Sequence, residues 1–200
     1  PIPPLNLVAD FGGGGIYLAF GIMSALWEAG RTGKGQVVDA AIYESVMAFM
    51  ESLLPEFALA GHTRQRTGGI LPRIAPSGAY PCRDGMVIIG ANQDTLFARL
   101  AQMIGTDWAT DPRYATHDAR GENQIELDEM IADWSRARSM ADVLRLCDAN
   151  AIPCGPVHTA KEMLADAHLQ ARGATLDVFS PLVGQSVPMR APCPTRNMTR

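Results

Sequence analysis

An acidic side chain stands two residues before an unbroken run of four glycines in VADFGGGG, residues 8–15. A turn requires one or two glycines, because glycine adopts a positive φ without steric cost. Four in succession indicate that another group comes close to the backbone where Cβ atoms are absent. The run matches neither the dinucleotide-binding pattern nor the Walker pattern, since no Gly-Lys-Ser/Thr follows at the required spacing.

The aspartate before the glycines, Asp10, has two interpretations. It can cap or stabilise the start of the helix expected over 16–29, as acidic side chains do at helix N-termini. It can also attack a thioester or ester carbonyl, or act as an acid or base, while the glycine amides hold an oxyanion. Residue type alone leaves both interpretations open.

Composition and charge exclude several classes of protein. The chain of 200 residues is 47% hydrophobic and 19% charged, which is ordinary for a soluble globular protein. Its net charge is −4 with both signs interspersed, which argues against a nucleic-acid partner. The longest apolar run, over 16–27, is shorter than the roughly 20 residues of a membrane span. We therefore expect a cytoplasmic protein with neither nucleic acid nor membrane as a partner.

The first residues, PIPPLN, lack a starting Met and lack the charged and apolar regions of a signal peptide. They are typical of the interior of a longer gene, so we expect this chain to be a fragment whose upstream part is missing.

The cysteines and histidines indicate no metal site. The four cysteines are scattered, and no pair has C-x-x-C spacing, so neither a zinc site nor a redox motif is predicted. The four histidines stand in polar loops or at helix ends, where surface or capping roles are the default. We expect no metal and no bound cofactor. The cysteines are Cys82, Cys147, Cys154 and Cys193.

The pattern predicts an α/β region at the start of the chain, over 1–60. A largely apolar helix that is buried on most sides is followed by a β-branched strand, which indicates a layer with a parallel sheet. A linker rich in Gly, Arg, Thr and Pro follows over 61–75. The predicted elements of the first region are an extended segment over 1–9, the helix 16–29, the strand 35–42, and a helix over 43–60 that is interrupted or ends near Pro55.

A smaller α+β domain is predicted over 76–172. Arg83-Asp84-Gly85 forms a turn between two strands, and Ser139, Thr159 and Asp166 are helix caps. A return segment toward the first region is predicted over 173–200, with two weak strands around Gly184 and a loosely ordered end. The other predicted elements are strands 79–82 and 86–91, helices 94–104, 123–137, 140–150, 159–165 and 166–172, and a short extended piece between Pro153 and Pro156.

Two polar loops are candidates for ligand contacts. Gly90-Ala-Asn-Gln-Asp follows a predicted strand and precedes a helix, so it is either a plain cap or a set of polar groups, Asn92 and Gln93, over a cleft. Arg31 and Lys34 lie in a glycine-containing loop that either meets a phosphate or is a solvated turn.

Several stretches together resemble the family III CoA-transferases, which include the α-methylacyl-CoA racemases. The resemblance covers about residues 3 to 175, and RTGKGQVVD with AYPCRDG is specific in combination. The stretches are PLNLVADFGGGG, RTGKGQVVDAAIYESV, APSGAYPCRDGMVIIGANQDTLFARLAQMIG, DPRYATHDAR and Pro153-Cys-Gly-Pro-Val.

The resemblance implies a fold, an assembly and a reaction. The fold class is α/β, with a Rossmann-like large domain, of which this chain holds the C-terminal part only, and a small α+β domain. Two full-length chains would interlock as a homodimer. Coenzyme A would be a substrate. In the transferases the aspartate that matches Asp10 forms an aspartyl mixed anhydride and then an aspartyl-CoA thioester, from which a carboxylic acid collects the CoA.

The racemases use the same aspartate with a histidine to move the proton α to the thioester. That histidine would lie before Pro1. The racemases also carry a glutamate in a G-A-x-E pattern, where this chain has Gln93, which cannot take a proton. This loop favours the transferases, whereas DFGGGG is more similar to the racemases, so both reactions stay open, as does an inactive or truncated family member. The residues implied at the substrate are Asn6, Gly12, Gly13, Gly14, Asn92 and Gln93.

Overall fold

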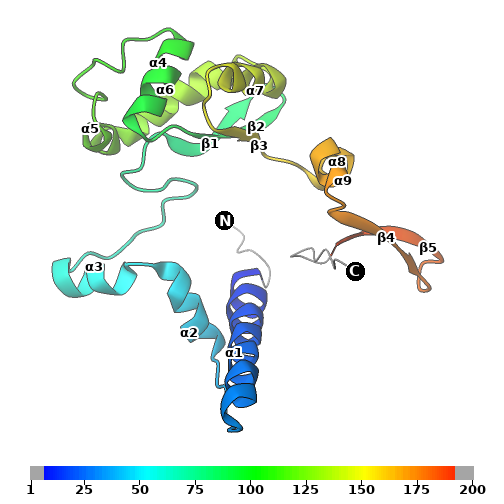
Figure 1. The fold of residues 1–200 in the computed structure, drawn as a ribbon. Coiled ribbons are helices and arrows are strands. Elements are labelled where there is room, and N and C mark those ends of the chain that lie inside the picture. The colour runs from blue at the N-terminus through cyan, green and yellow to red at the C-terminus, as the bar shows by residue number, and fades with distance from the viewer. Residues whose placement is uncertain (1–6, 192–200) are drawn as a thin grey trace. The chain divides into compact units, whose positions relative to one another are not determined.

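The computed structural model describes residues 7–191 (Figure 1). The chain divides into two compact units, Pro1–Gly68 and Gly69–Arg200, and each is described by itself. The predicted boundaries at 60, 75 and 172 and the return of 173–200 toward the first region stay predictions. No helix in the part that the structure describes is long and apolar enough to cross a membrane.

The first unit is helical. A π-helix, η1, is followed by the long helix α1, which ends where Gly33 takes a left-handed conformation and its N–H donates to the Ala29 carbonyl at 2.8 Å. Only glycine adopts that conformation without strain, so the helix ends there and not near Gly30 as predicted. The elements of this unit are η1 Leu7–Ile16, α1 Tyr17–Thr32, α2 Ile42–Met47, the 3₁₀ turn η2 Ala48–Met50 and α3 Leu53–Ala60.

The glycine run lies inside η1, so residues 7–9 are helical and not extended as predicted, and the helical segment begins before the glycines and not at them. Residues 1–6 lie outside the described part. The backbone of η1 comes close to itself at Gly15, where an added Cβ would stand 3.2 Å from the backbone oxygen of Asp10. The glycines therefore allow the helical backbone to approach itself closely, and π-helical turns are frequent at functional sites.

Three further predictions for this unit are wrong. Residues 34–41 form no strand, and the described residues of this unit contain none, because a β-branched run is stabilised only by a paired strand. The break before α3 falls at Glu51, whose φ is 52°, while Pro55 sits in the first turn of α3, where its missing N–H costs nothing. Helix α1 buries no side chain against the described residues, and Phe20 and Trp27 are 74% and 71% exposed.

The second unit is built on a three-stranded antiparallel sheet of order β1-β2-β3. Figure 1 shows helices α4, α6 and α7 on one side of it. Val87 and Ile89 are fully buried in the core, whereas the intervening Ile88 is exposed, as expected when one sheet face is covered. The elements are β1 Ser77–Cys82, β2 Gly85–Gly90, β3 Cys154–Pro156, α4 Asp94–Ile104, α5 His117–Glu122, α6 Gln124–Arg136 and α7 Met140–Ala149.

Most local predictions for the second unit are confirmed. The strands meet at the predicted turn, and the side chain of Ser139 accepts from the Asp142 N–H at 3.2 Å as the cap of α7. Thr159 and Asp166 cap the next two short helices. Helix α5 was not predicted, because six residues are too few to show a helical period. The remaining elements are α8 Ala160–Ala165, α9 Ala167–Ala171 and the hairpin β4 Thr175–Ser180 with β5 Gln185–Arg190, which turns at Gly184. The predicted loose end lies outside the described residues, apart from Ala191.

Candidate active site

Asp10 lies in the first turn of η1 and is exposed. The first N–H groups of a helix lack partners within it, and negatively charged side chains are common at such helix starts. Glycines further along a π-helix direct their N–H groups to carbonyls five residues earlier. The oxyanion role expected of Gly12, Gly13 and Gly14 stays a prediction, as does the role of Asn6, which lies outside the described residues.

An apolar pocket of about 540 Å³ opens beside this turn of η1. Tyr17 and Phe49 form one wall, with their rings edge to face and their centroids 5.7 Å apart. Gly12, one of the predicted substrate residues, also lines the pocket. The pocket is lined by Val8, Gly12, Ile16, Tyr17 and Phe49.

The other predicted substrate residues, Asn92 and Gln93, lie in the second unit between β2 and α4. Gln93 is the N-cap residue of α4, with extended backbone and an exposed side chain that makes no capping hydrogen bond. Asn92 is half-buried. The two interpretations of this segment, a plain Asn/Asp cap and polar groups over a cleft, therefore both stay predictions, although the side chain of Gln93 itself forms no cap.

Sequence reasoning missed Arg120, which lies in α5 within DPRYATHDAR. Its side chain is fully buried, and its guanidinium contacts the backbone of Asn92 and the carboxylate of Asp94. Arginine is ordinarily a surface residue, so its type predicted nothing. The only available signal was its place within a stretch that carries the family resemblance.

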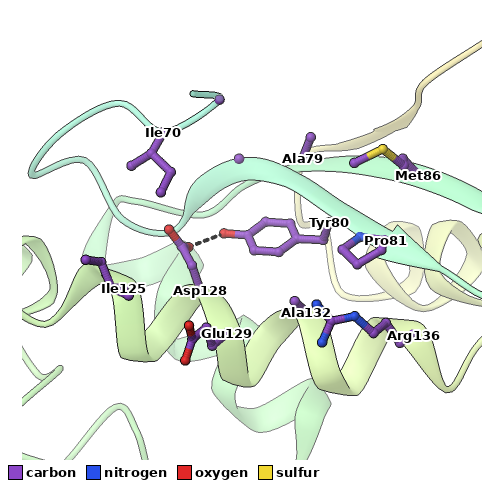
Figure 2. A pocket seen from close by; sticks show the side chains of 12 residues that line it. Ile70, Ala79, Tyr80, Pro81, Met86, Ile125, Asp128, Glu129, Ala132 and Arg136 are labelled. Carbon is purple, nitrogen blue, oxygen red and sulfur yellow. Dashed lines mark hydrogen bonds between the residues drawn. The ribbon is translucent and has the colours of Figure 1, made fainter. Parts of the chain in front are cut away.

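A second pocket, of about 430 Å³, lies between β1 and α6 and contains none of the predicted site residues. Figure 2 shows the Tyr80 side chain directed at Asp128, and its hydroxyl donates to Oδ1 of Asp128 at 2.6 Å. Burial raises the pKa of both groups above their ordinary values. Ile70, Met86, Ile125, Glu129 and Arg136 also line the pocket.

This buried carboxyl predicts a pH dependence of stability. A carboxyl whose pKa is raised on folding contributes stability that is full below its unfolded pKa of about 3.8 and is lost as the pH rises through its folded pKa. Asp128→Asn retains an acceptor for Tyr80 but does not titrate. We expect the wild type to lose stability relative to Asp128→Asn in urea unfolding as the pH rises above about 4. Glu129→Gln changes an exposed residue of the same pocket and is the control, so it should lose stability with rising pH as the wild type does. An equal loss in Asp128→Asn and Glu129→Gln would contradict the assignment of this pH dependence to Asp128.

No group of three His, Cys, Asp or Glu residues suited to a metal ion occurs within residues 7–191. Cys82, Cys147 and Cys154 are free thiols. Cys147 is buried and hydrogen-bonds Cys154, and this bond together with burial raises the pKa of Cys147. A thiol with a raised pKa is unreactive, which fits a structural role.

The sequence pattern of CoA-transferase family III matches residues 1–199. This chain belongs to CoA-transferase family III. Among its curated relatives, the succinyl-CoA–D-citramalate CoA-transferase of Chloroflexus aurantiacus is 50% identical over an alignment of 171 positions that covers 84% of this chain and 42% of that protein. The succinate–glutarate CoA-transferase of Agrobacterium fabrum is 32% identical over an alignment of 188 positions that covers 88% of this chain and 47% of that protein.

Solved structures confirm the α/β fold class of this CoA-transferase family III chain. A CAIB/BAIF family protein from Brucella suis superimposes with a TM-score of 0.74 at 30% identity, covering 99% of this chain and 50% of that one. The chain therefore spans about half the length of the relatives that it matches.

Proposed function

We propose that the enzyme containing this chain transfers coenzyme A from an acyl-CoA to a carboxylic acid, with Asp10 as the nucleophile. The observation that carries the proposal is the 50% identity to a CoA-transferase. The exposed carboxylate of Asp10, in the first turn of η1, supports its role.

The chemistry conserves one thioester and one carboxylate. The Asp10 carboxylate attacks the acyl-CoA carbonyl, forms a mixed anhydride and releases CoA thiolate. The thiolate attacks the aspartyl carbonyl, which forms an aspartyl-CoA thioester and releases the donor acid. The acceptor carboxylate then attacks this thioester, and the thiolate returns to the acceptor's acyl carbonyl and frees Asp10. Splitting the transfer into such steps is the general advantage of covalent catalysis.

We further propose succinyl-CoA as the donor and a small dicarboxylic acid as the acceptor. The names of the relatives at 50% and 32% identity combine succinyl-CoA or succinate with citramalate or glutarate. A site for such a pair must accept a second carboxylate on both donor and acceptor. The implied interlocked homodimer and the cytoplasmic location stay predictions.

The test incubates the enzyme, expressed from its complete gene, in D₂O with succinyl-CoA, a 2-methylacyl-CoA and a panel of mono- and dicarboxylic acids. Mass spectrometry of the CoA esters reads both candidate reactions. We expect new esters of dicarboxylic acids without deuterium at the α carbon. Deuterium at the α carbon without a new ester would establish the racemase reaction instead, and neither change would indicate an inactive family member.

A further inference from the structure

A fully buried arginine in the second unit binds the segment that carries two of the predicted substrate residues. Arg120 has no exposed side-chain surface, and its guanidinium carbon lies 4.5 Å from the centre of the Phe97 ring. Its planar donors have a fixed geometry, so they hold their acceptors in fixed relative positions. Nε donates to Ala75 O at 3.1 Å, Nη1 to Tyr114 O at 3.0 Å, and Nη2 to Asn92 O at 2.8 Å and Asp94 Oδ1 at 2.6 Å.

These contacts lie on both sides of Gln93 in the sequence. Arg120 holds the carbonyl of the residue before it, the carboxylate of the residue after it, and the face of Phe97 one turn into α4. The Gln93 carbonyl is itself held by the Phe97 N–H at 2.8 Å. The backbone on both sides of Gln93 is therefore fixed, while its side chain is exposed.

The rest of the segment is anchored independently of Arg120. The Gly90 N–H donates to Pro153 O at 3.0 Å and the Ala91 N–H to Pro76 O at 2.9 Å. Arg120 thus holds Asn92 and Asp94, which follow the end of β2 at Gly90. Helix α5 is itself closely placed, because a Cβ on Gly121 would stand 2.8 Å from Arg73 O.

The energetics favour a geometric role for this charge. Burying a guanidinium carries a desolvation penalty, which its partners offset only when their geometry is good. An apolar residue of similar volume often stabilises a protein equally well. The partner Asp94 is 66% exposed, so the ion pair is screened on one side. A buried arginine here is best explained by the fixed position that it imposes.

We propose that Arg120 is a positioning residue that sets Asn92 and Gln93 for contact with the acyl-CoA or the acid. Arg120 is enclosed and does not itself touch the substrate. The inference rests on the proposed function only for the identity of the ligand that the side-chain amides of Asn92 and Gln93 contact. The position of the segment is measurable without any substrate.

The test compares Arg120→Lys and Asp94→Asn with Asp118→Asn in the enzyme from the complete gene. Asp118 also lies in α5 and is 89% exposed, so it is the matched control. Asp94→Asn removes the charge pair by changing an exposed side chain. It is therefore expected to fold even if Arg120→Lys does not. We expect kcat to fall about 10- to 100-fold in Arg120→Lys and about 3- to 10-fold in Asp94→Asn, because small displacements of positioning groups have such effects.

Hydrogen exchange without substrate provides the second readout. We expect faster exchange of the backbone amides of residues 92–97 in Arg120→Lys and Asp94→Asn but not in Asp118→Asn. In a double-mutant cycle, Gln93→Ala should abolish most of the effect of Arg120→Lys on kcat, since residues that act through each other are not additive. Unchanged exchange, or faster exchange with normal kcat, would overturn the positioning role.

Failure of the proposed function would look different. If the wild type transfers no CoA, the proposed function fails, and exchange still decides whether Arg120 fixes the segment. If transfer is normal in Asn92→Ala and Gln93→Ala, the transferase stands and this inference is overturned.

Discussion

Asp10→Asn is expected to reduce CoA transfer by about 10³- to 10⁶-fold, the range seen when a nucleophile or its unit is removed from an enzyme. Asparagine has nearly the same shape as aspartate, but its neutral amide oxygen does not attack a thioester. The fall should appear in kcat at saturating acyl-CoA, with little change in unfolding temperature, because Asp10 is exposed. The measurement is the rate of new CoA ester formation by the enzyme from the complete gene.

Glu28→Gln is the matched control for charge, because it removes one exposed carboxylate from the same unit. It is expected to keep normal transfer. Mass spectrometry of wild-type enzyme quenched during turnover should find CoA joined to the peptide that contains Asp10, and Asp10→Asn should lack this adduct. Normal transfer by Asp10→Asn would refute the assignment of the nucleophile.

Ile131→Ala is expected to lower the free energy of unfolding of the second unit by about 2–5 kcal/mol. Ile131 is fully buried in α6, so truncation loses apolar burial and leaves a cavity among packed neighbours. Urea unfolding followed by the fluorescence of the buried Trp108 reports on this unit.

Ile125→Ala makes the same chemical change in the same helix, where the side chain is 70% exposed. Its effect should stay within about 0.5 kcal/mol, as for surface substitutions generally. Equal effects of the two substitutions would mean that α6 does not pack against the core as described.

Many elements of the second unit could be predicted from short stretches, because their signals are local. Ser139 and Thr159 accept hydrogen bonds from N–H groups three residues on, and the turn at 83–85 joins two strands, β1 and β2, that pair with each other. Such contacts need no distant partner, so residue order alone indicates where they form. The family could likewise be recognised from the sequence, because its motifs are contiguous.

In the first unit, local sequence signals are not sufficient to predict the secondary structure. The β-branched run at 35–41 is typical of a strand, but a strand also needs a partner, and the described residues of this unit supply none. The glycines after Asp10 have no periodic signal, and only the structure shows that they lie in the helix η1.

The amino-acid sequence by itself determined the α/β class, the family, the candidate nucleophile Asp10 and the polar segment with Asn92 and Gln93. Tertiary structure alone decided what holds that segment. Arg120 reaches Asn92 and Asp94 across more than twenty positions of sequence. The burial of its charge depends on acceptors from three separate parts of the chain, and no pattern of neighbouring residues encodes such a meeting.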